Sequence, residues 1–455
     1  MAEKKAHFVG IGGIGMSGIA RVLMQMGMDV SGSDAKESLL TRELHDRGAA
    51  ISIGHAAANV HGAAEVVVSS AIRPDNIEVC EARRLGIPIV HRALKLAQLV
   101  NTHRGIAIAG THGKTTTSSM AATVLSHAGL VPSYVVGGII KTLSDNARAG
   151  QSEWFIIEAD ESDGSLVEFH PEIAIITNIE LDHTDYYRSR SQLDDIFSRY
   201  ISNIKPGGLC VYCADDPGAR SLLETIGGCC ECVSYGLNPG ARLVARNIET
   251  NGLCGAFDVE FDDEHLGPAA LNVPGEHNVA NSLAVIAAAL RVGLSFEQAV
   301  QGLAAFHGVE RRFEIIGHND QYIVVDDYAH HPSEIKATLC AARKQGRRIV
   351  SIFQPHRFSR TQSLATEFGA AFVNADEVVV TDIYSAGEDP IPHVSSDLIV
   401  QSLRDNHHPS VHFISGLDKV ADYVANIVRP NDLVITLGAG DVWKVARTLS
   451  QRLIN

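Results

Sequence analysis

The amino-acid sequence predicts an α/β fold in three domains. Short apolar runs, typical of buried strands, alternate with helical patterns through most of the chain, which favours parallel sheets covered by helices. The chain has 455 residues, enough for about three domains at roughly 150 residues each. The alternation begins anew near residues 101 and 310, so we predict domains at residues 1–100, 101–309 and 310–455.

Composition and charge narrow the class of protein. Apolar residues make up 45% of the chain and charged residues 20%, which is ordinary for a folded soluble protein. The net charge of −15 argues against a broad nucleic-acid-binding surface or an anchor on an anionic membrane. No apolar run approaches the roughly 18 residues of a spanning helix, and the N-terminus lacks a secretory pattern. We therefore expect a cytoplasmic protein, monomeric or homodimeric, that neither binds nucleic acid nor inserts into a membrane.

The first domain begins with a nucleotide-binding pattern. An apolar strand at Ala6–Ile11 runs into the turn Gly10-x-Gly12-x-x-Gly15, a helix follows, and a second strand at Met28–Ser31 ends near Asp34. This order of strand, glycine turn, helix, strand and acid is the fingerprint of a Rossmann-like domain that binds a dinucleotide. The glycines indicate only that a pyrophosphate-like group approaches a helix N-terminus, so NAD and other diphosphates both fit.

The stretch after residue 104 predicts a phosphate-binding loop, as in P-loop ATPases. An apolar strand at Gly105–Ala109 leads through a glycine-bounded turn into a helix at Ser118–His127. In this setting Lys114 supplies a point charge to a phosphate, and the Thr115 hydroxyl is placed to bind Mg²⁺. The generic motif G-x-x-x-x-G-K-[ST] would put its first glycine at position 108, whereas the early glycine here is Gly110. An ordinary strand-to-helix turn with an exposed lysine therefore remains the alternative.

Polar residues follow several predicted strands at their carboxyl ends. Ser70 ends a strand of the first domain, Glu158 follows the strand Trp154–Ile157, and His183 follows the strand Ile173–Ile176. Because neighbouring parallel strands present their carboxyl ends at one edge, we expect Glu158 and His183 near the phosphate loop. With the loop threonine they form a ligand set for Mg²⁺, in which histidine is the less usual member. The alternatives are a solvated strand-end acid and a hydrogen-bonding loop histidine.

Four of the eight cysteines form the pattern Cys210-x-x-Cys213 and Cys229-x-x-Cys232, which fits zinc-ribbon spacing. However, Leu209–Cys213 has the pattern of a strand, and two residues three apart on a strand point to opposite faces. Neither pair contains the tight glycine turn that would wrap both thiolates round one ion. We favour reduced, largely buried thiols, with a structural Zn²⁺ as the alternative.

The third domain repeats the alternation of strands and helices. Its predicted strands, each ending in polar or glycine-containing sequence, are Tyr322–Val325, Ile349–Phe353, Glu377–Thr381 and Leu433–Leu437. Arg357 and Arg360 lie together after the second of these strands. Such a pair can hold a carboxylate bidentately, and a solvated pair is the alternative. Before this domain, a polar turn at residues 274–278 leads into a long helix at Val279–Val292.

Seven motifs, in order and over essentially the whole chain, resemble those of the Mur ligases. They are Gly110-Thr111-His112-Gly113-Lys114-Thr115-Thr116, Glu158-Ala159-Asp160-Glu161-Ser162-Asp163, Thr177-Asn178-Ile179-Glu180 with Asp182-His183, Gly275-x-His277-Asn278, Arg311-Arg312-Phe313, Asp326-Asp327-Tyr328-x-His330-His331-Pro332 and Phe353-Gln354-Pro355-His356-Arg357. One such motif is a weak signal, whereas seven in the same order are specific. Together with the N-terminal glycine turn, they are most similar to the branch that joins L-alanine to UDP-N-acetylmuramate.

The resemblance implies a ligand for each domain. For the diphosphate of a UDP-sugar, in place of NAD, it implies Gly10, Gly12, Gly13, Gly15, Asp34 and Ser70. For ATP it implies Gly110, Thr111, His112, Gly113, Lys114, Thr115, Thr116, His277, Asn278, Arg312 and Asp327. For Mg²⁺ it implies Thr115, Glu158 and His183, and for L-alanine it implies His331, Arg357 and Arg360. The residues that it implies for catalysis are Lys114, Glu158, His183, Arg312 and His331.

The implied reaction makes an amide from a carboxylate at the expense of ATP. The lactyl carboxylate of UDP-N-acetylmuramate is first phosphorylated, and the alanine amine then attacks the acyl phosphate. Lys114, Mg²⁺ and Arg312 would stabilise charge on oxygen in both steps, and His331 is a candidate to accept the amine proton. Because the reactants arrive on three domains, we expect the third domain to close over the second and exclude water.

Three other functions remain open on the sequence. An NAD-dependent dehydrogenase accounts for the first 34 residues but leaves Lys114 without a role. A P-loop switch ATPase that acts on a protein partner would hydrolyse ATP without a UDP-sugar. A related ligase that joins a preformed tripeptide to the same sugar nucleotide is only weakly separated by the sequence.

Overall fold

The computed structural model describes residues 5–181, 186–187, 189–228 and 230–454. Contacts divide the chain into two compact units: residues 1–245, 259–267 and 280–306 form the first, and residues 246–258, 268–279 and 307–455 form the second. Parallel strands dominate the sheets of both units, so the predicted α/β fold class is confirmed. Within the described ranges, no helix has the length and apolar character needed to cross a membrane.

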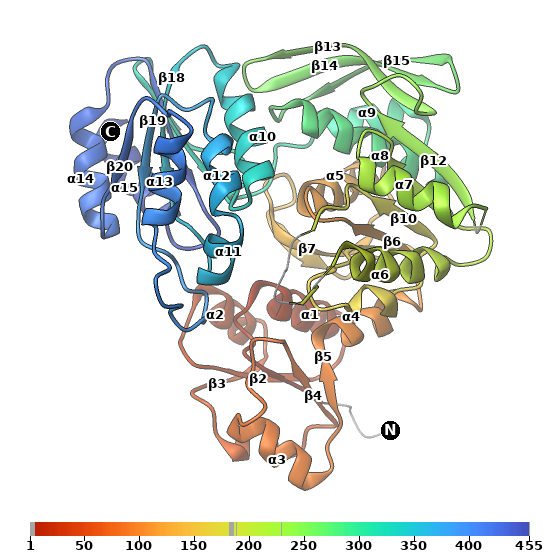
Figure 1. Cartoon of the computed structure of the whole chain (residues 1–455). Coiled ribbons are helices and arrows are strands. Elements are labelled where there is room, and N and C mark those ends of the chain that lie inside the picture. Colours follow the sequence, from red (N-terminus) through yellow and green to blue (C-terminus); the bar gives the residue numbers. More distant parts are fainter. Residues whose placement is uncertain (1–4, 182–185, 188, 229, 455) are drawn as a thin grey trace. The chain divides into compact units, whose positions relative to one another are not determined.

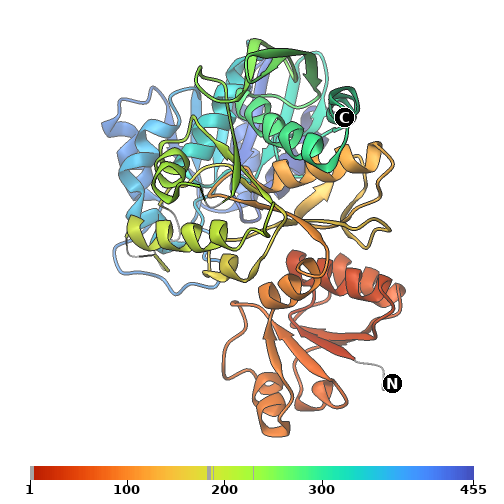
Figure 2. The same ribbon diagram turned by 90° about the vertical axis from the view of Figure 1, so that its right-hand side faces the viewer.

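The first sheet has five parallel strands in the order β3-β2-β1-β4-β5, with helices on both faces (Figures 1 and 2). Its elements are β1 (Ala6–Val9), α1 (Ile14–Gln25), β2 (Val30–Asp34), α2 (Leu39–Asp46), β3 (Ala50–Ile53), the 3-10 turn η1 (Ala57–Val60), β4 (Glu65–Val68), α3 (Ile77–Leu85), β5 (Ile89–His91) and α4 (Arg92–Val100). The chain reverses its strand order between β1 and β4, and a switch point of this kind opens a crevice at the carboxyl ends of the strands. The glycine turn after β1 lies at that crevice.

Helix α1 also packs on a hairpin of the second sheet, formed by β7 (Ser133–Ile140) and β8 (Asp145–Arg148). A Cβ atom on Gly18 would lie 3.2 Å from the Ala147 Cβ and 3.3 Å from Val135 Cγ1, so glycine permits the close approach. Beside it, the buried Arg21 side chain donates hydrogen bonds to Asp145 and Asn146. The hydrophobic core is continuous across this contact.

The second sheet carries the phosphate loop. Within the first unit its order is β12-β11-β10-β6-β9-β7-β8, and all neighbours except β7 and β8 are parallel. Its elements are β6 (Arg104–Ala109), α5 (Lys114–His127), β9 (Trp154–Glu158), η2 (Ser165–Glu168), β10 (Ile173–Ile176), α6 (Arg190–Ser202), β11 (Leu209–Cys213), α7 (Pro217–Ile226) and β12 (Glu231–Gly236). The chain continues through β13 (Leu243–Asn251), β14 (Cys254–Phe261), β15 (Glu264–Leu271), α8 (Glu276–Val292) and α9 (Phe296–Ala304).

The third sheet belongs to the second unit and has the order β16-β17-β21-β18-β19-β20, in which only β16 is antiparallel to its neighbour. Its elements are β16 (Glu314–His318), β17 (Tyr322–Asp327), α10 (Pro332–Arg343), β18 (Arg348–Phe353), α11 (Phe358–Ser363), α12 (Ala365–Ala371), β19 (Glu377–Val380), α13 (Asp397–Asp405), β20 (Val411–Phe413), α14 (Leu417–Ile427), β21 (Asp432–Leu437) and α15 (Trp443–Leu453). One core cluster joins the sheet to α10, α12 and α13, and another joins it to α14 and α15 (Figure 1). Helices therefore cover both faces.

The helix after the phosphate loop begins earlier than the sequence predicts. The expected start was Ser118, whereas α5 starts at Lys114. Threonine and serine are weak helix formers, so the run Lys114 to Ser119 hides the first turn from a propensity argument. Gly113, with φ +82°, precedes the helix in the left-handed conformation, and the first amides of the helix therefore adjoin the loop.

Candidate active site

The shape of the phosphate loop explains its displaced glycine. Gly110 has φ +133°, and a Cβ atom there would lie 2.8 Å from the Asn178 carbonyl oxygen and closer still to Thr177 Oγ1. The end of β10 therefore leaves room only for glycine at position 110. Ile108, where the generic motif has its glycine, lies inside β6 and is fully buried, so a regular strand residue suffices there.

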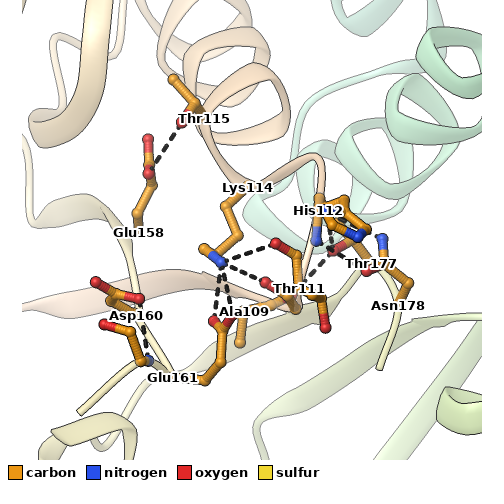
Figure 3. Close-up of polar contacts among 12 residues, drawn as sticks. Ala109, Thr111, His112, Lys114, Thr115, Glu158, Asp160, Glu161, Thr177 and Asn178 are labelled. Carbon is orange, nitrogen blue, oxygen red and sulfur yellow. Dashed lines mark hydrogen bonds and ion pairs between the residues drawn. The ribbon is translucent and has the colours of Figure 1, made fainter. Parts of the chain in front are cut away.

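The end of β10 also fixes the loop by hydrogen bonds (Figure 3). The His112 amide donates to Asn178 Oδ1 at 2.8 Å, and the Thr111 amide donates to the Asn178 carbonyl at 3.1 Å. Asn178 Nδ2 and Thr177 Oγ1 both donate to the His112 carbonyl, at 3.0 and 2.6 Å. The Thr111 hydroxyl donates to the Glu180 carbonyl at 3.0 Å. The loop thus has a defined conformation set by side chains of the neighbouring strand end.

Lys114 lies across the loop and forms an ion pair with Glu161. Its Nζ donates to the Gly110 carbonyl at 2.5 Å, to the Thr111 carbonyl at 3.2 Å and to both Glu161 carboxylate oxygens at 2.8 and 3.1 Å (Figure 3). Burial by itself would lower the pKa of Lys114, but the negative charges of Glu161 and Asp160 raise it above its ordinary value. The ammonium group is therefore charged and fixed where a phosphate of a bound nucleotide would adjoin the loop.

Thr115 and Glu158 lie side by side, as the sequence predicts. The Thr115 hydroxyl donates to Glu158 Oε2 at 3.1 Å (Figure 3). The Ser118 hydroxyl and the Gly137 amide donate to Glu158 Oε1 at 3.1 and 2.5 Å. A hydroxyl beside a carboxylate is a set of hard oxygen donors, which suits Mg²⁺. His183, the third predicted ligand, lies outside the described residues. Thr116 follows on the first turn of α5 and is partly exposed.

The glycine turn of the first domain is hydrogen-bonded to Asp34, the acidic residue at the end of β2. The Gly12 amide donates to Asp34 Oδ2 at 2.9 Å, and Gly10 adopts φ +78°. Gly13 is the residue before α1, and a Cβ atom on Gly15 would lie 3.2 Å from Arg92 Nη1. These residues therefore line one edge of the sheet. Ser70 is exposed just after β4, the neighbour of β1.

A buried network of polar side chains centred on Glu78 lies next to the glycine turn of the first domain. Glu78 is fully buried and accepts hydrogen bonds from the Ser33 hydroxyl at 2.6 Å, from Asn59 Nδ2 at 2.6 Å and from the Ala56 amide at 3.2 Å. Its carboxylate also contacts His7 Nε2 at 3.3 Å. Burial alone would raise the pKa of Glu78, but the hydrogen bonds, led by that of His7, lower it to about 2. The Ser33 carbonyl in turn accepts from the amides at the start of the glycine turn.

The entrance of α8 holds the predicted adenine-binding pair. Asn278 is buried, and its Nδ2 donates to the Pro274 carbonyl at 2.7 Å. His277 is exposed and folds back over Gly275, whose φ is +97°; a Cβ atom there would lie 2.7 Å from His277 Nδ1. Glycine at position 275 therefore makes room for the imidazole.

Arg312 and Asp327 lie at one end of the antiparallel pair β16 and β17: Arg312 precedes β16, and Asp327 is the last residue of β17. Asp327 accepts hydrogen bonds from the Phe313 amide at 2.6 Å and the Ala329 amide at 2.7 Å. Burial raises the pKa of this carboxyl to about 6, against the opposing charge of Arg312. The Arg312 guanidinium lies 5.0 Å from the centre of the Tyr328 ring. Two groups of opposite charge thus flank one strand end.

Two of the predicted amino-acid residues, Arg357 and Arg360, lie near His356, which the sequence did not identify as a site residue. His331 precedes α10 and accepts the Ser333 amide at 3.4 Å. Arg357 has φ +72°, and its Nη1 lies 3.8 Å from Glu388 Oε1. Arg360 Nη1 lies 3.3 Å from His356 Nδ1. Burial, followed by the charges of His330 and Arg360, lowers the pKa of His356 to about 3, so this imidazole is neutral near pH 7.

The sequence alone did not identify two further residues that contact the phosphate loop. Glu161 is the acidic partner of Lys114, and Asn178 fixes the loop backbone. Both belong to motifs quoted for the Mur ligases, but spacing alone gave no reason to prefer them over Asp160 or Glu180. Only the folded strand ends show which side chain reaches the loop.

Three family models match the chain in order. The Mur ligase family, catalytic domain model matches residues 5–104, the Mur ligase middle domain model matches residues 108–289, and the Mur ligase, glutamate ligase domain model matches residues 311–440. Together they span most of the sequence.

Related proteins are similar in sequence to this chain over nearly its full length. A protein of Trichlorobacter lovleyi named UDP-N-acetylmuramate–L-alanine ligase is 46% identical over 453 residues, 99% of each chain. A protein of Desulforamulus reducens with the same name is 45% identical over 455 residues, covering 99% of this chain and 98% of the relative. The crystal structure of a Thermotoga maritima UDP-N-acetylmuramate-alanine ligase is similar with a TM-score of 0.84, 33% identity and 98% coverage of each chain. A murein peptide ligase of Psychrobacter arcticus has a TM-score of 0.73, 25% identity and 99% coverage of each chain. The resemblance found in the sequence is confirmed, and the chain belongs to the Mur ligase family.

Proposed function

We propose that this protein is an ATP-dependent ligase that joins L-alanine to the lactyl carboxylate of UDP-N-acetylmuramate, in peptidoglycan precursor synthesis. The main support for this proposal is similarity over the full length to relatives named UDP-N-acetylmuramate–L-alanine ligase. The glycine turn and the phosphate loop that such an enzyme needs are both formed in this chain. The reaction uses soluble nucleotides, so we place it in the cytoplasm. We also propose domain boundaries near residues 100 and 309.

We propose that each of the three domains binds a different substrate. We assign the diphosphate of the UDP-sugar to the turn that contains Gly12, because its amides border the switch point of the first sheet. We assign the ATP phosphates to the loop that contains Lys114, the adenine to His277 and Asn278, and the ribose to Asp327. The two arginines after β18, with His331, are assigned to the alanine carboxylate and amine.

The loop residues also fit a bound Mg²⁺. Thr115 and Glu158 offer a hydroxyl and a carboxylate within hydrogen-bond distance of each other, and oxygen donors of this kind are those that magnesium prefers. These two residues, with His183, would hold the ion. When bound, it would offset negative charge on the nucleotide phosphates.

The chain's own residues then account for both chemical steps. In the first, a carboxylate oxygen of the sugar nucleotide attacks the γ-phosphorus of ATP, and ADP leaves; the Lys114 ammonium stabilises charge on the phosphoryl oxygens. In the second, the uncharged alanine amine attacks the acyl carbon, and inorganic phosphate leaves. His331 uses Nδ1 to accept the Ser333 amide, and we propose that Nε2 accepts the amine proton.

Phosphate release tests the proposal. Purified protein would be given Mg²⁺ and ATP, with or without UDP-N-acetylmuramate, and with L-alanine, glycine, L-serine or a tripeptide in turn. We expect release that requires the sugar nucleotide and is fastest with L-alanine. Turnover that ignores the sugar nucleotide would favour a switch ATPase, and a preference for the tripeptide would favour the peptide-adding relative. NAD binding without ATP turnover would restore the dehydrogenase hypothesis.

A further inference from the structure

The fold does not bring together the cysteines that are paired in the sequence pattern. Cys210 on β11 is the register partner of Cys232 on the adjacent parallel strand β12. Cys213 lies three residues further along β11 and pairs in register with Tyr235. Cys229 lies outside the described residues. The thiols of Cys210 and Cys213 therefore do not belong to one site.

A different set of three thiols comes together instead. Cys210 and Cys232 lie side by side as register partners on adjacent parallel strands, and the Cys232 thiol donates to the Cys230 carbonyl at 3.6 Å. Cys210 is fully buried, whereas Cys230 and Cys232 are half-buried at the edge of the core. Small molecules can therefore reach the outer thiols but not the inner one.

The three thiols differ in acidity. Interaction with the neighbouring Cys230 and Cys232 thiols, together with burial, raises the pKa of Cys210 well above its ordinary value. Interaction with the adjacent Cys210 thiol lowers the pKa of Cys232, against the opposing effects of burial and of the Cys230 thiol. Because the thiolate is the reactive form of cysteine, the accessible member of the pair is also the more nucleophilic one.

We propose that Cys210 and Cys232 are a thiol oxidation site that forms a reversible disulfide with low-molecular-weight disulfides such as glutathione disulfide. The Cys232 thiolate attacks one sulfur of the small disulfide, forms a mixed disulfide and releases one thiolate. The Cys210 thiol then passes its proton to the small thiolate released in the first step and attacks the Cys232 sulfur; the mixed disulfide bond breaks, and the second small thiolate leaves and takes up a proton from water. Two protein thiols are oxidised, and one small disulfide is reduced to two thiols.

Strand geometry makes this disulfide strained and hence easily reduced. Neighbouring strands lie about 4.7–4.9 Å apart, which is within the range of about 4.4–6.8 Å that Cα atoms span in disulfides. Side chains of register partners on parallel strands extend in the same direction, so their Cβ atoms stay about one strand spacing apart. A relaxed disulfide needs Cβ atoms about 3.5–4.5 Å apart. The strands must therefore be drawn together, and a strained bond of this kind is labile and reversible.

Peptide mapping of the full-length protein tests the site. The reduced protein would be equilibrated with glutathione buffers of increasing disulfide content, its remaining thiols alkylated, and the product digested with trypsin. Cys210 lies in the peptide Tyr200–Arg220 and Cys232 in the peptide Ser221–Arg242. We expect a linked pair, two hydrogens lighter than the sum of the two peptides, that disappears when reduced glutathione is added.

Variants identify the sulfurs. Cys213→Ser should retain the linked pair, and Cys210→Ser should lose it. If Cys210→Ser does not fold, Cys232→Ala at the half-buried position gives the same test and should also lose the link. The proposal is overturned by a disulfide confined to Ser221–Arg242, by a link that survives Cys210→Ser, or by oxidation of the exposed Cys80, Cys254 and Cys340 while the cluster stays reduced. One tightly held zinc ion per chain, detected by metal analysis, would also overturn it.

Discussion

The ion pair between Lys114 and Glu161 does two things at once. It fixes the ammonium group at the phosphate loop, and it neutralises a carboxylate that is only 1% exposed. An isolated buried charge is costly, so each residue depends on the other for its stability in the fold. Activity and stability can therefore be separated by changing the two residues singly and together.

Replacing Lys114 tests this coupling. We expect Lys114→Met to reduce kcat/KM by about 10²–10³, because a donor to the transferred phosphoryl group is lost. We also expect it to lower the free energy of unfolding by roughly 3–5 kcal/mol, because the buried Glu161 carboxylate loses the opposite charge of Lys114. The double variant Lys114→Met/Glu161→Gln should regain most of the stability and none of the activity. Urea unfolding and phosphate release measure both effects, and a Lys114→Met variant as stable as the wild type would contradict the account.

Thr115 offers a test of metal binding with a matched control on the same helix. Thr115→Val removes the hydroxyl beside Glu158, so we expect a several-fold rise in the Mg²⁺ concentration needed for half-maximal ATP turnover. Thr123→Val makes the same change where the hydroxyl only bonds the Ser119 carbonyl, and its Mg²⁺ requirement should stay the same. Equal behaviour of the two variants in a magnesium titration would argue against a ligand role for Thr115.

At the scale of elements, the sequence predicts buried parallel strands well and edge elements poorly. Ile173–Ile176 and Leu209–Cys213 match the structure at both ends, because a strand covered on both faces is a continuous apolar run. The hairpin of β7 and β8 escaped prediction, since β8 reads Asp-Asn-Ala-Arg and has no apolar alternation of its own. It is joined to the sheet by its pairing with β7 and also contacts α1, and no local pattern of the sequence reveals either partner.

The contact between α1 and this hairpin depends on a missing side chain. Gly18→Leu must displace Val135 and Ala147, so we expect a loss of about 1–3 kcal/mol in the free energy of unfolding. Gly18→Ala provides a graded control. It adds one methyl group in a tight space, but the higher helix propensity of alanine offsets about 0.5–1 kcal/mol of the cost. Urea denaturation of both variants would refute the packing argument if the leucine variant were as stable as the alanine variant.

The buried network beneath the glycine turn predicts a pH dependence. The folded state lowers the pKa of Glu78 from 4.5 to about 2, so it favours the charged form. The resulting stabilisation is fully present above about pH 4.5 and is lost as the pH falls toward 2. Glu78→Gln should therefore cost about 3 kcal/mol at neutral pH, at roughly 1.4 kcal/mol per tenfold change in proton affinity, and progressively less on acidification.

Unfolding curves across this pH range measure the effect. The stability difference between the wild type and Glu78→Gln should shrink between pH 5 and the lowest pH at which both remain folded. Glu37→Gln is the control, because Glu37 forms an exposed pair with Arg42 that solvent screens. A difference for Glu78→Gln that is independent of pH would show that the hydrogen bonds do not act through the charge.

At the scale of the whole molecule, the sequence gives the order of the domains and most strand ends but not the partners within the site. Lys114 and Thr115 are recognisable because a loop between a strand and a helix has a local pattern. Glu161 as the partner of Lys114 is set by how neighbouring strands lie beside one another in space. His356 and Arg360 are only four residues apart, and their contact depends on how the loop after β18 leads into α11. Those pairings involve side chains with several equally spaced competitors, so spacing alone cannot choose among them.

The proposed reaction predicts a large conformational change. The sugar nucleotide, ATP and the amino acid are assigned to three domains, so their reacting atoms meet only when the domains close. We expect small-angle scattering to show a smaller radius of gyration when a non-hydrolysable ATP analogue and UDP-N-acetylmuramate are both present than with either alone. An unchanged radius of gyration under saturating ligands would count against closure.

The clamp that Asn178 and Thr177 place on the phosphate loop has a thermodynamic consequence for nucleotide binding. Fixing a residue's backbone costs about 1–2 kcal/mol in conformational entropy, and here that loss is incurred when the protein folds. ATP therefore meets a loop whose disorder has already been removed, so the free energy of binding is not reduced by the entropy cost of ordering it. Substitutions at Thr177 and Asn178, which follow β10, would therefore weaken nucleotide binding indirectly, because loosening the loop transfers the ordering cost from folding to binding.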